Sequence, residues 1–212
     1  MDVRMLTVGP IQENCFLFRR DGSDRALIVD PGDEPDRILA EIEAMGVTLD
    51  AILLTHTHFD HVGAVAPLAR ATNAEVWVPE LEKDILANIN EYVRWPGFGP
   101  FEDYDAEHTI AGGEKLELAG FEIEVLFTPG HSPGHVTFHI PDEAAVFSGD
   151  VLFQGSVGRT DLPGGDSQTL MDSLRMLAER LPDETVVHPG HMGITTIGAE
   201  RATNPFLGQF AR

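Results

Sequence analysis

The chain has one cysteine, few basic residues and no long apolar run. Cys15 cannot form an internal disulfide, and its place in the apolar stretch "NCFLF" predicts a buried, inert thiol. No continuous apolar run approaches the 18 or so residues needed to span a membrane. The N-terminus carries charges at Asp2 and Arg4 and has no long apolar segment, so we expect no targeting signal. These absences indicate a soluble, cytoplasmic protein.

Positive charge is also scarce, with 14 Lys and Arg against 35 Asp and Glu and a formal net charge of −21. Phosphate groups would be repelled by such a chain, so we expect neither nucleic acid nor a membrane surface as a partner. The oligomeric state is not readable from the sequence. Part of the negative charge can be offset by bound cations.

Short β-rich runs alternate with helical patterns in the first half. The predicted strands lie at residues 3–9, 15–20, 26–30, 51–56 and 75–79, and the predicted helices at 34–46 and 62–72. Residues 83–107 are rich in Gly, Pro and aromatics, which predicts a short helix and then an irregular loop.

The second half repeats the order of strands first and helix after. It predicts a hairpin over 115–130 that turns at Ala119–Gly120, strands at 135–140, 144–150 and 185–190, and a helix at 167–181. This order indicates an α/β protein of two sheets stacked face to face with helices outside. We find no linker or repeat, so we expect a single domain over residues 1–212.

A dense cluster of metal-ligand side chains follows the strand at 51–56. The motif "HTHFDH" supplies His56, His58, Asp60 and His61 within six residues. Crowded imidazoles and a carboxylate at one strand end are a poor choice for stability alone, whereas they are common zinc ligands. The motif therefore predicts a metal site.

Three further strand ends carry a ligand-type side chain beside a glycine turn: His131, Asp150 and His191. A structural zinc is closed by four ligands, but seven candidates are present here. Seven suits a catalytic pair of metals that share one carboxylate, and Asp150 is the natural bridge.

The remaining histidines and Asp30 have other expected roles. His135 follows the same turn as His131 and could support the site from behind the ligands, and Asp30 could orient a ligand histidine or cap its own turn. His108 is expected in an exposed loop, and His139 and His188 are expected to be structural.

In the order "HTHFDH", "GHSPGH", "SGD" and "PGH", the chain resembles the metallo-β-lactamase superfamily. The segments "FSGDVLFQGSVGRTDLPGGD" and "GAERATNPFL" resemble short glyoxalase II-like hydroxyacylglutathione hydrolases. The resemblance implies a four-layer αβ/βα sandwich of two mixed sheets and two ions, zinc or alternatively iron or manganese. It implies the following ligands: His56, His58 and His131 for one ion, Asp60, His61 and His191 for the other, with Asp150 bridging.

The resemblance also implies hydrolysis of a small-molecule thioester such as S-lactoylglutathione. We expect attack by a hydroxide shared between the ions, with Asp60 orienting it. Longer glyoxalase II enzymes carry a C-terminal helical domain that holds glutathione, and 21 residues follow His191 here, so we expect no such domain. Arg159 could meet a substrate carboxylate, or form an ion pair with Asp161 or Asp166.

Two alternatives stay open. Persulfide dioxygenases are similar in sequence to glyoxalase II but use one iron and oxygen, and imidazole and carboxylate ligands accommodate either metal. The same centre could also hydrolyse another ester, a lactone, a β-lactam or a phosphodiester, because selectivity lies in the loops.

Overall fold

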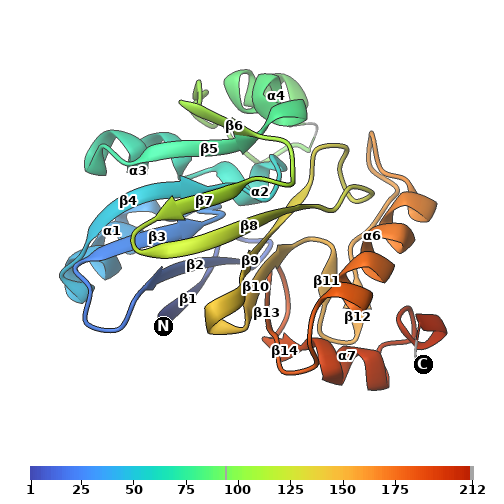
Figure 1. The fold of residues 1–212 in the computed structure, drawn as a ribbon. Coiled ribbons are helices and arrows are strands. Elements are labelled where there is room, and N and C mark those ends of the chain that lie inside the picture. Colours follow the sequence, from blue (N-terminus) through green and yellow to red (C-terminus); the bar gives the residue numbers. More distant parts are fainter. Residues whose placement is uncertain (94, 211–212) are drawn as a thin grey trace. The chain divides into compact units, whose positions relative to one another are not determined.

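The computed structural model describes residues 1–93 and 95–210 and divides the chain into two compact units (Figure 1). The first unit comprises residues 1–110 and 117–121, and the second comprises residues 111–116 and 122–212. Each unit contains most of one six-stranded mixed sheet and the helices that pack on it. The predicted α/β class with two mixed sheets is confirmed.

The first sheet has the strand order β1-β2-β3-β4-β5-β6. Its strands are β1 (Asp2–Val8), β2 (Glu13–Arg19), β3 (Arg25–Val29), β4 (Thr48–Leu53), β5 (Glu75–Pro79) and β6 (His108–Ile110). The first two pairs are antiparallel, and β3 to β6 run parallel to one another. The carboxyl ends of β3, β4 and β5 therefore lie along one edge of this sheet.

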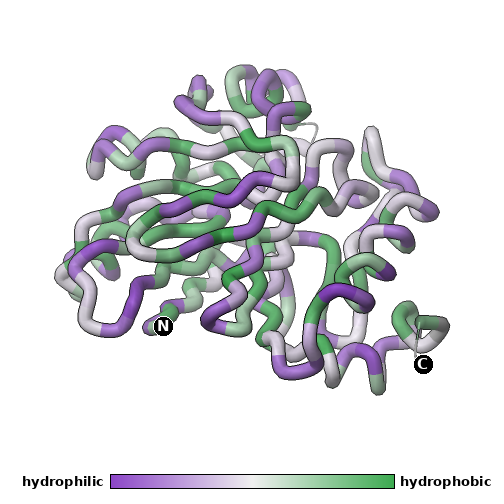
Figure 2. The backbone as a smooth tube through the Cα atoms, viewed as in Figure 1, coloured by the Kyte–Doolittle hydropathy of each residue, from purple (hydrophilic) through white to green (hydrophobic). Residues whose placement is uncertain are grey.

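Helices cover one face of this sheet: α1 (Pro35–Met45) and α3 (Val65–Thr72). Their apolar sides, including Ile38 and Leu68, pack with strand residues such as Leu17 and Ile52 in one buried cluster. Figure 2 shows the green, hydrophobic positions along these strands. Pro35 is the first residue of α1 and Gly46 ends the helix with φ of 64°, as expected for these residue types.

Short helical segments complete the first unit. They are α2 (Phe59–Val62), the 3₁₀ turn η1 (Glu80–Glu82), α4 (Lys83–Ala87) and α5 (Ile89–Tyr92). The helix predicted at 62–72 is α3, which begins later, at Val65, because the chain turns at Gly63–Ala64 after α2. His108 begins β6 and is not in a loop; its ring stacks on Trp77 and contacts Glu75.

The second sheet has the order β14-β13-β10-β9-β8-β7. Its strands are β7 (Lys115–Leu118), β8 (Phe121–Phe127), β9 (Val136–Ile140), β10 (Ala145–Gly149), β13 (Val186–Pro189) and β14 (Thr195–Thr196). The predicted hairpin turns at Ala119 and Gly120, both with positive φ. The strand β9 is antiparallel to both β8 and β10, and β13 is parallel to β10. The carboxyl ends of β8, β10 and β13 therefore lie at one edge of this sheet.

The helix α6 (Ser167–Arg180) packs on this sheet, and α7 (Ile197–Thr203) follows β14. Asp166 caps α6 by accepting the backbone N–H of Thr169. The turn η2 (Pro141–Glu143), the hairpin β11 (Leu152–Phe153) and β12 (Ser156–Val157), and the turn η3 (Gly208–Phe210) complete the unit. None of the helices within residues 1–93 and 95–210 has the length and apolar character that a membrane crossing requires.

Candidate functional site

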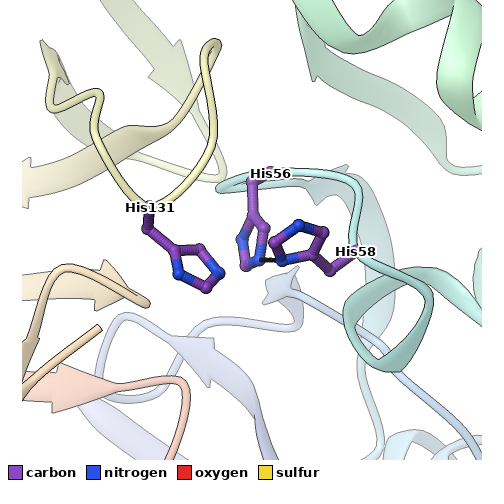
Figure 3. A group of neighbouring side chains, drawn as sticks. All are labelled: His56, His58 and His131. Atoms are coloured by element: carbon purple, nitrogen blue, oxygen red, sulfur yellow. Dashed lines mark hydrogen bonds between the residues drawn. The ribbon is translucent and has the colours of Figure 1, made fainter. Parts of the chain in front are cut away.

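The first set of candidate ligands lies on the loop after β4. His56 is fully buried, and its Nε2 lies 3.1 Å from Nδ1 of His58 (Figure 3). Ligand nitrogens about 2.0–2.1 Å from one tetrahedral ion are about 3.3 Å apart. The separation of these two nitrogens therefore fits two ligands of one ion.

Thr55 fixes the tautomer of His56. The Thr55 hydroxyl donates its only hydrogen to Oδ2 of Asp30, at 2.6 Å, so it must accept from Nδ1–H of His56, at 3.0 Å. Nε2 of His56 then carries the lone pair that a metal requires in a neutral ring.

Asp30 fixes the tautomer of His61 through a direct contact. Oδ2 of Asp30 lies 3.1 Å from Nδ1 of His61, and Oδ1 accepts the backbone N–H of Thr55 at 2.7 Å. A carboxylate beside Nδ1 holds a proton there and leaves Nε2 as the ligand atom, 3.8 Å from Oδ2 of Asp60. The structure thus brings Asp30, His56 and His61 together, and ligand atoms of the three lie within 4.8 Å of one another.

Two buried acids in this unit were not anticipated from the sequence. Glu82, on η1 after β5, accepts the backbone N–H and the hydroxyl of Thr57. Glu13, on β2, lies 3.8 Å from Nδ1 of His61. Neither acid belongs to a motif, and the available signal for Glu82 is that it follows the end of a parallel strand.

Close packing positions the turn that carries Asp60. A Cβ on Gly32 would lie 1.7 Å from the backbone oxygen of Asp60, so no other residue fits there without a shift. A shallow apolar groove borders Asp60 in this unit, with Ile11, Phe98 and Phe101 among its lining residues.

The second set of candidate ligands lies in the second unit, at the ends of β8, β10 and β13. Nδ1–H of His131 donates to the backbone oxygen of Arg159 at 2.8 Å, and because a carbonyl can only accept, Nε2 of His131 carries the lone pair. Oδ2 of Asp150 lies 3.4 Å from Nε2 of His131 and 3.6 Å from Nε2 of His191. These distances are near the ligand separation of about 3.3 Å expected around an ion.

His135 holds the backbone next to this set. Its Nε2 accepts the N–H of Asp150 at 3.0 Å, and its Nδ1 lies 3.0 Å from the hydroxyl of Thr128. Nε2 is occupied by that bond, so His135 is built to support Asp150 rather than to bind an ion.

Arg159 forms the ion pair that was one of its two predicted roles. Its guanidinium donates two 2.7 Å bonds to Asp161. The pair lowers the pKa of Asp161 to about 2. The Arg159 side chain is about three-fifths exposed. Its predicted contact with a substrate carboxylate stays a prediction.

Three other titratable residues are structural, as expected. His188 stacks on Phe147, and burial lowers its pKa to about 4. His139 contacts Glu124 on the neighbouring strand. Cys15 is fully buried, and burial is the main cause that raises its thiol pKa, followed by the charges of Glu13 and Asp30.

Comparison with known proteins places these residues in a family context. A model of the metallo-beta-lactamase superfamily matches residues 8–191. The chain is 41% identical to the "Probable metallo-hydrolase YqgX" of Bacillus subtilis, with all of both chains covered. It is 39% identical to the "Hydroxyacylglutathione hydrolase GloC" of Haemophilus influenzae, with 98% of each chain covered.

Solved structures agree on the fold. TTHA1623 in a di-iron-bound form has a TM-score of 0.87 at 45% identity, covering 97% of this chain and all of the other. The BLEG-1 B3 metallo-beta-lactamase has a TM-score of 0.91 at 38% identity, covering 97% of this chain and 99% of the other.

Proposed function

Since the chain belongs to the metallo-β-lactamase superfamily, whose members are metal-dependent, we propose that it is a binuclear metallohydrolase that cleaves a small-molecule thioester of the hydroxyacylglutathione class. The observation that carries this proposal is the set of fixed tautomers. In His56, His61 and His131, an acceptor holds the proton on Nδ1, so Nε2 is the ligand atom.

We assign the ligands by the order of the family motifs. His56, His58 and His131 would hold one ion, Asp60, His61 and His191 would hold the other, and Asp150 would serve both. The imidazoles and carboxylates, all buried or half-buried, are a donor set that zinc, iron and manganese accept, so the residues fit such ions. Asp150 suits the shared position because one of its oxygens is close to two ring nitrogens.

Two bound ions supply Lewis acidity and a nucleophilic hydroxide near neutral pH. The side chains of the chain do the rest. Asp60 accepts a hydrogen bond from the attacking group and aims it at the thioester carbonyl. The carbonyl carbon gains the new C–O bond, the C–S bond breaks, and the thiolate leaves and takes up a proton from solvent. His135 and Asp30 keep the ligands oriented throughout.

The groove beside Asp60 has an apolar lining, which favours a substrate with an apolar part. Phe59 packs its ring against Phe98 and Phe101, so the wall of the groove is formed by mutually supported aromatic rings. An acyl group that packs against this apolar surface would lie next to Asp60, the residue that we propose orients the nucleophile.

A β-lactam is the second candidate substrate, favoured by the 38% identity to the BLEG-1 B3 metallo-beta-lactamase. Both substrates present a carbonyl to the same nucleophile, and the residues that hold the ions do not discriminate between them. A substrate panel distinguishes the two.

The test begins with the metal content of the purified protein, measured by elemental analysis before any reconstitution. We expect about two ions per chain, and turnover of S-lactoylglutathione at least tenfold faster than that of a β-lactam panel. The variant His58→Ala should lose metal and turnover together, whereas the matched variant His108→Ala, which removes an imidazole stacked on Trp77, should keep both.

Three results would contradict the proposal. A metal-free His58→Ala protein with full turnover rules out the metal mechanism. About one iron per chain, with oxygen uptake on a glutathione persulfide, favours the dioxygenase. Turnover of β-lactams alone favours the second candidate.

A further inference from the structure

The segment "THTH" at residues 55–58 alternates threonine with the proposed ligands His56 and His58. In an extended segment, side chains at alternate positions share a side. His56 and His58 meet each other through their ring nitrogens, whereas the two threonines each bond to a different buried carboxylate. The two carboxylates therefore anchor this loop through its threonines.

Thr55 is anchored by Asp30, at the end of β3. One oxygen of Asp30 accepts the backbone N–H of Thr55 and the other accepts its hydroxyl. This anchor lies on the side of β3, which neighbours β4 in the sheet.

Thr57 is anchored by Glu82, which follows β5, the strand on the other side of β4. A single oxygen, Oε2 of Glu82, accepts the backbone N–H of Thr57 at 2.6 Å and its hydroxyl at 3.0 Å. Glu82 follows β5, so the two acids approach the loop from the strands on either side of β4. Its side chain is 1% exposed.

Burial of a carboxylate is costly unless strong hydrogen bonds compensate, and bonds to a charged acceptor are about twice as strong as neutral ones. Both bonds given above for Glu82 go to the residue between two proposed ligands.

We propose that Glu82 is a positioning residue for the metal-binding loop. It holds Thr57 so that His56 and His58 face one ion in the geometry that binding needs, and it forms a pair of anchors with Asp30. This inference rests on the proposed function, because it assumes that His56 and His58 are metal ligands.

The experiment measures the Zn²⁺ dissociation constant by competition with a chromophoric chelator for the wild type, Glu82→Ala and Glu82→Gln. We expect Glu82→Ala to weaken binding by about 10- to 100-fold, as loss of outer-shell partners does in other metal sites. Glu82→Gln keeps an oxygen acceptor for Thr57 and should recover most of the affinity. The matched control is Glu80→Gln, an exposed acid on the same turn, which should bind like the wild type.

Two further readouts separate positioning from general stability. The d–d spectrum of the Co²⁺-substituted protein should change in Glu82→Ala and return in Glu82→Gln, while the unfolding midpoint of the metal-free proteins is measured in parallel. If Glu82→Ala does not fold, Thr57→Val tests the same anchor, since it removes only the hydroxyl bond and should weaken Zn²⁺ binding by about three- to tenfold.

Wild-type affinity and spectrum in a folded Glu82→Ala, or in Thr57→Val, would overturn the inference. The variant His58→Ala distinguishes failure of the proposed function from failure of the inference about Glu82. If His58→Ala leaves Zn²⁺ affinity unchanged, the proposed function fails; if it abolishes binding while the Glu82 and Thr57 variants do not alter it, the inference alone fails.

Discussion

Asp30 contacts Thr55, in the loop after β4, and His61, in α2, and through the Thr55 hydroxyl it also sets the proton of His56. We predict that Asp30→Asn weakens Zn²⁺ binding by about 10- to 100-fold, because an amide has one acceptor oxygen and donates from its other end. Chelator competition measures the change.

The matched control for that variant is Asp36→Asn, which alters an exposed acid on α1. Both variants remove one negative charge, so a difference between them reports the contacts and not the charge. Equal affinities in the two variants would show that the contacts of Asp30 with Thr55 and His61 do not affect Zn²⁺ binding.

His188 gives the chain a pH-dependent stability at the scale of one residue. Burial lowers its pKa from 6.5 to about 4, so the folded state keeps it neutral where the unfolded state takes up a proton. Stability contributed by neutral His188 is complete above pH 6.5 and is lost as pH falls toward 4, by about 3 kcal/mol in all.

Urea unfolding of the metal-free protein at pH 7.0 and pH 4.5 measures this loss. We compare the wild type with His188→Gln. Subtracting the pH-dependent change in the unfolding free energy of the variant from that of the wild type removes the contribution of the carboxylates, which both proteins share. The free energy of unfolding should fall more steeply in the wild type than in the variant. Parallel curves would mean that His188 is protonated in the folded state at pH 4.5.

At the scale of elements, most strands and helices follow from the sequence because their pattern is long enough to read. The run "ALIVD" predicts β3, and "SQTLMDSLRMLAERL" predicts α6 over nearly its observed span. The strand β6 has three residues, too few for a period, and exists by pairing with β5. β14 and the hairpin β11–β12 are shorter still, and α7 spans only two turns.

The candidate ligands were predictable for the same reason, since each follows a readable strand. Two of the groups that hold the ligand loops were not. Glu82 and the backbone oxygen of Arg159 contact these loops from distant parts of the sequence, and the single local signal is that Glu82 follows the end of a strand. The division of the ligands between two ions stays a prediction.

The approach of α6 to the loop of His131 gives an element-scale prediction. A Cβ on Gly130, which has φ of 128°, would lie 2.2 Å from the backbone nitrogen of Leu170. Because that atom belongs to the helix backbone, Gly130→Ala must move the loop or the helix. We expect a loss of several kcal/mol in stability, about 3 or more, and loss of Zn²⁺ binding at His131.

The control is Gly113→Ala, since Gly113 has φ of 98° and an added Cβ meets nothing within 4 Å. This variant carries the backbone strain without the collision, so it should cost about 1–2 kcal/mol and keep Zn²⁺ binding. Thermal unfolding with and without Zn²⁺ measures both variants. Equal losses of stability in Gly130→Ala and Gly113→Ala would show that the positive φ, and not the collision with α6, causes the loss.

At the scale of the whole molecule, the formal charge of −21 acts on every charged substrate that approaches. S-lactoylglutathione is an anion near neutral pH, so the field of the protein slows its arrival, and added salt screens that field. We predict that kcat/KM for this thioester rises by about two- to fivefold as ionic strength increases from 10 to 300 mM. A thiocholine ester, which carries a fixed positive charge, is the matched probe and should show the opposite slope. If both esters slow with salt, or neither responds, then charges close to the reacting carbonyl, such as Arg159 and bound cations, govern arrival and not the net charge.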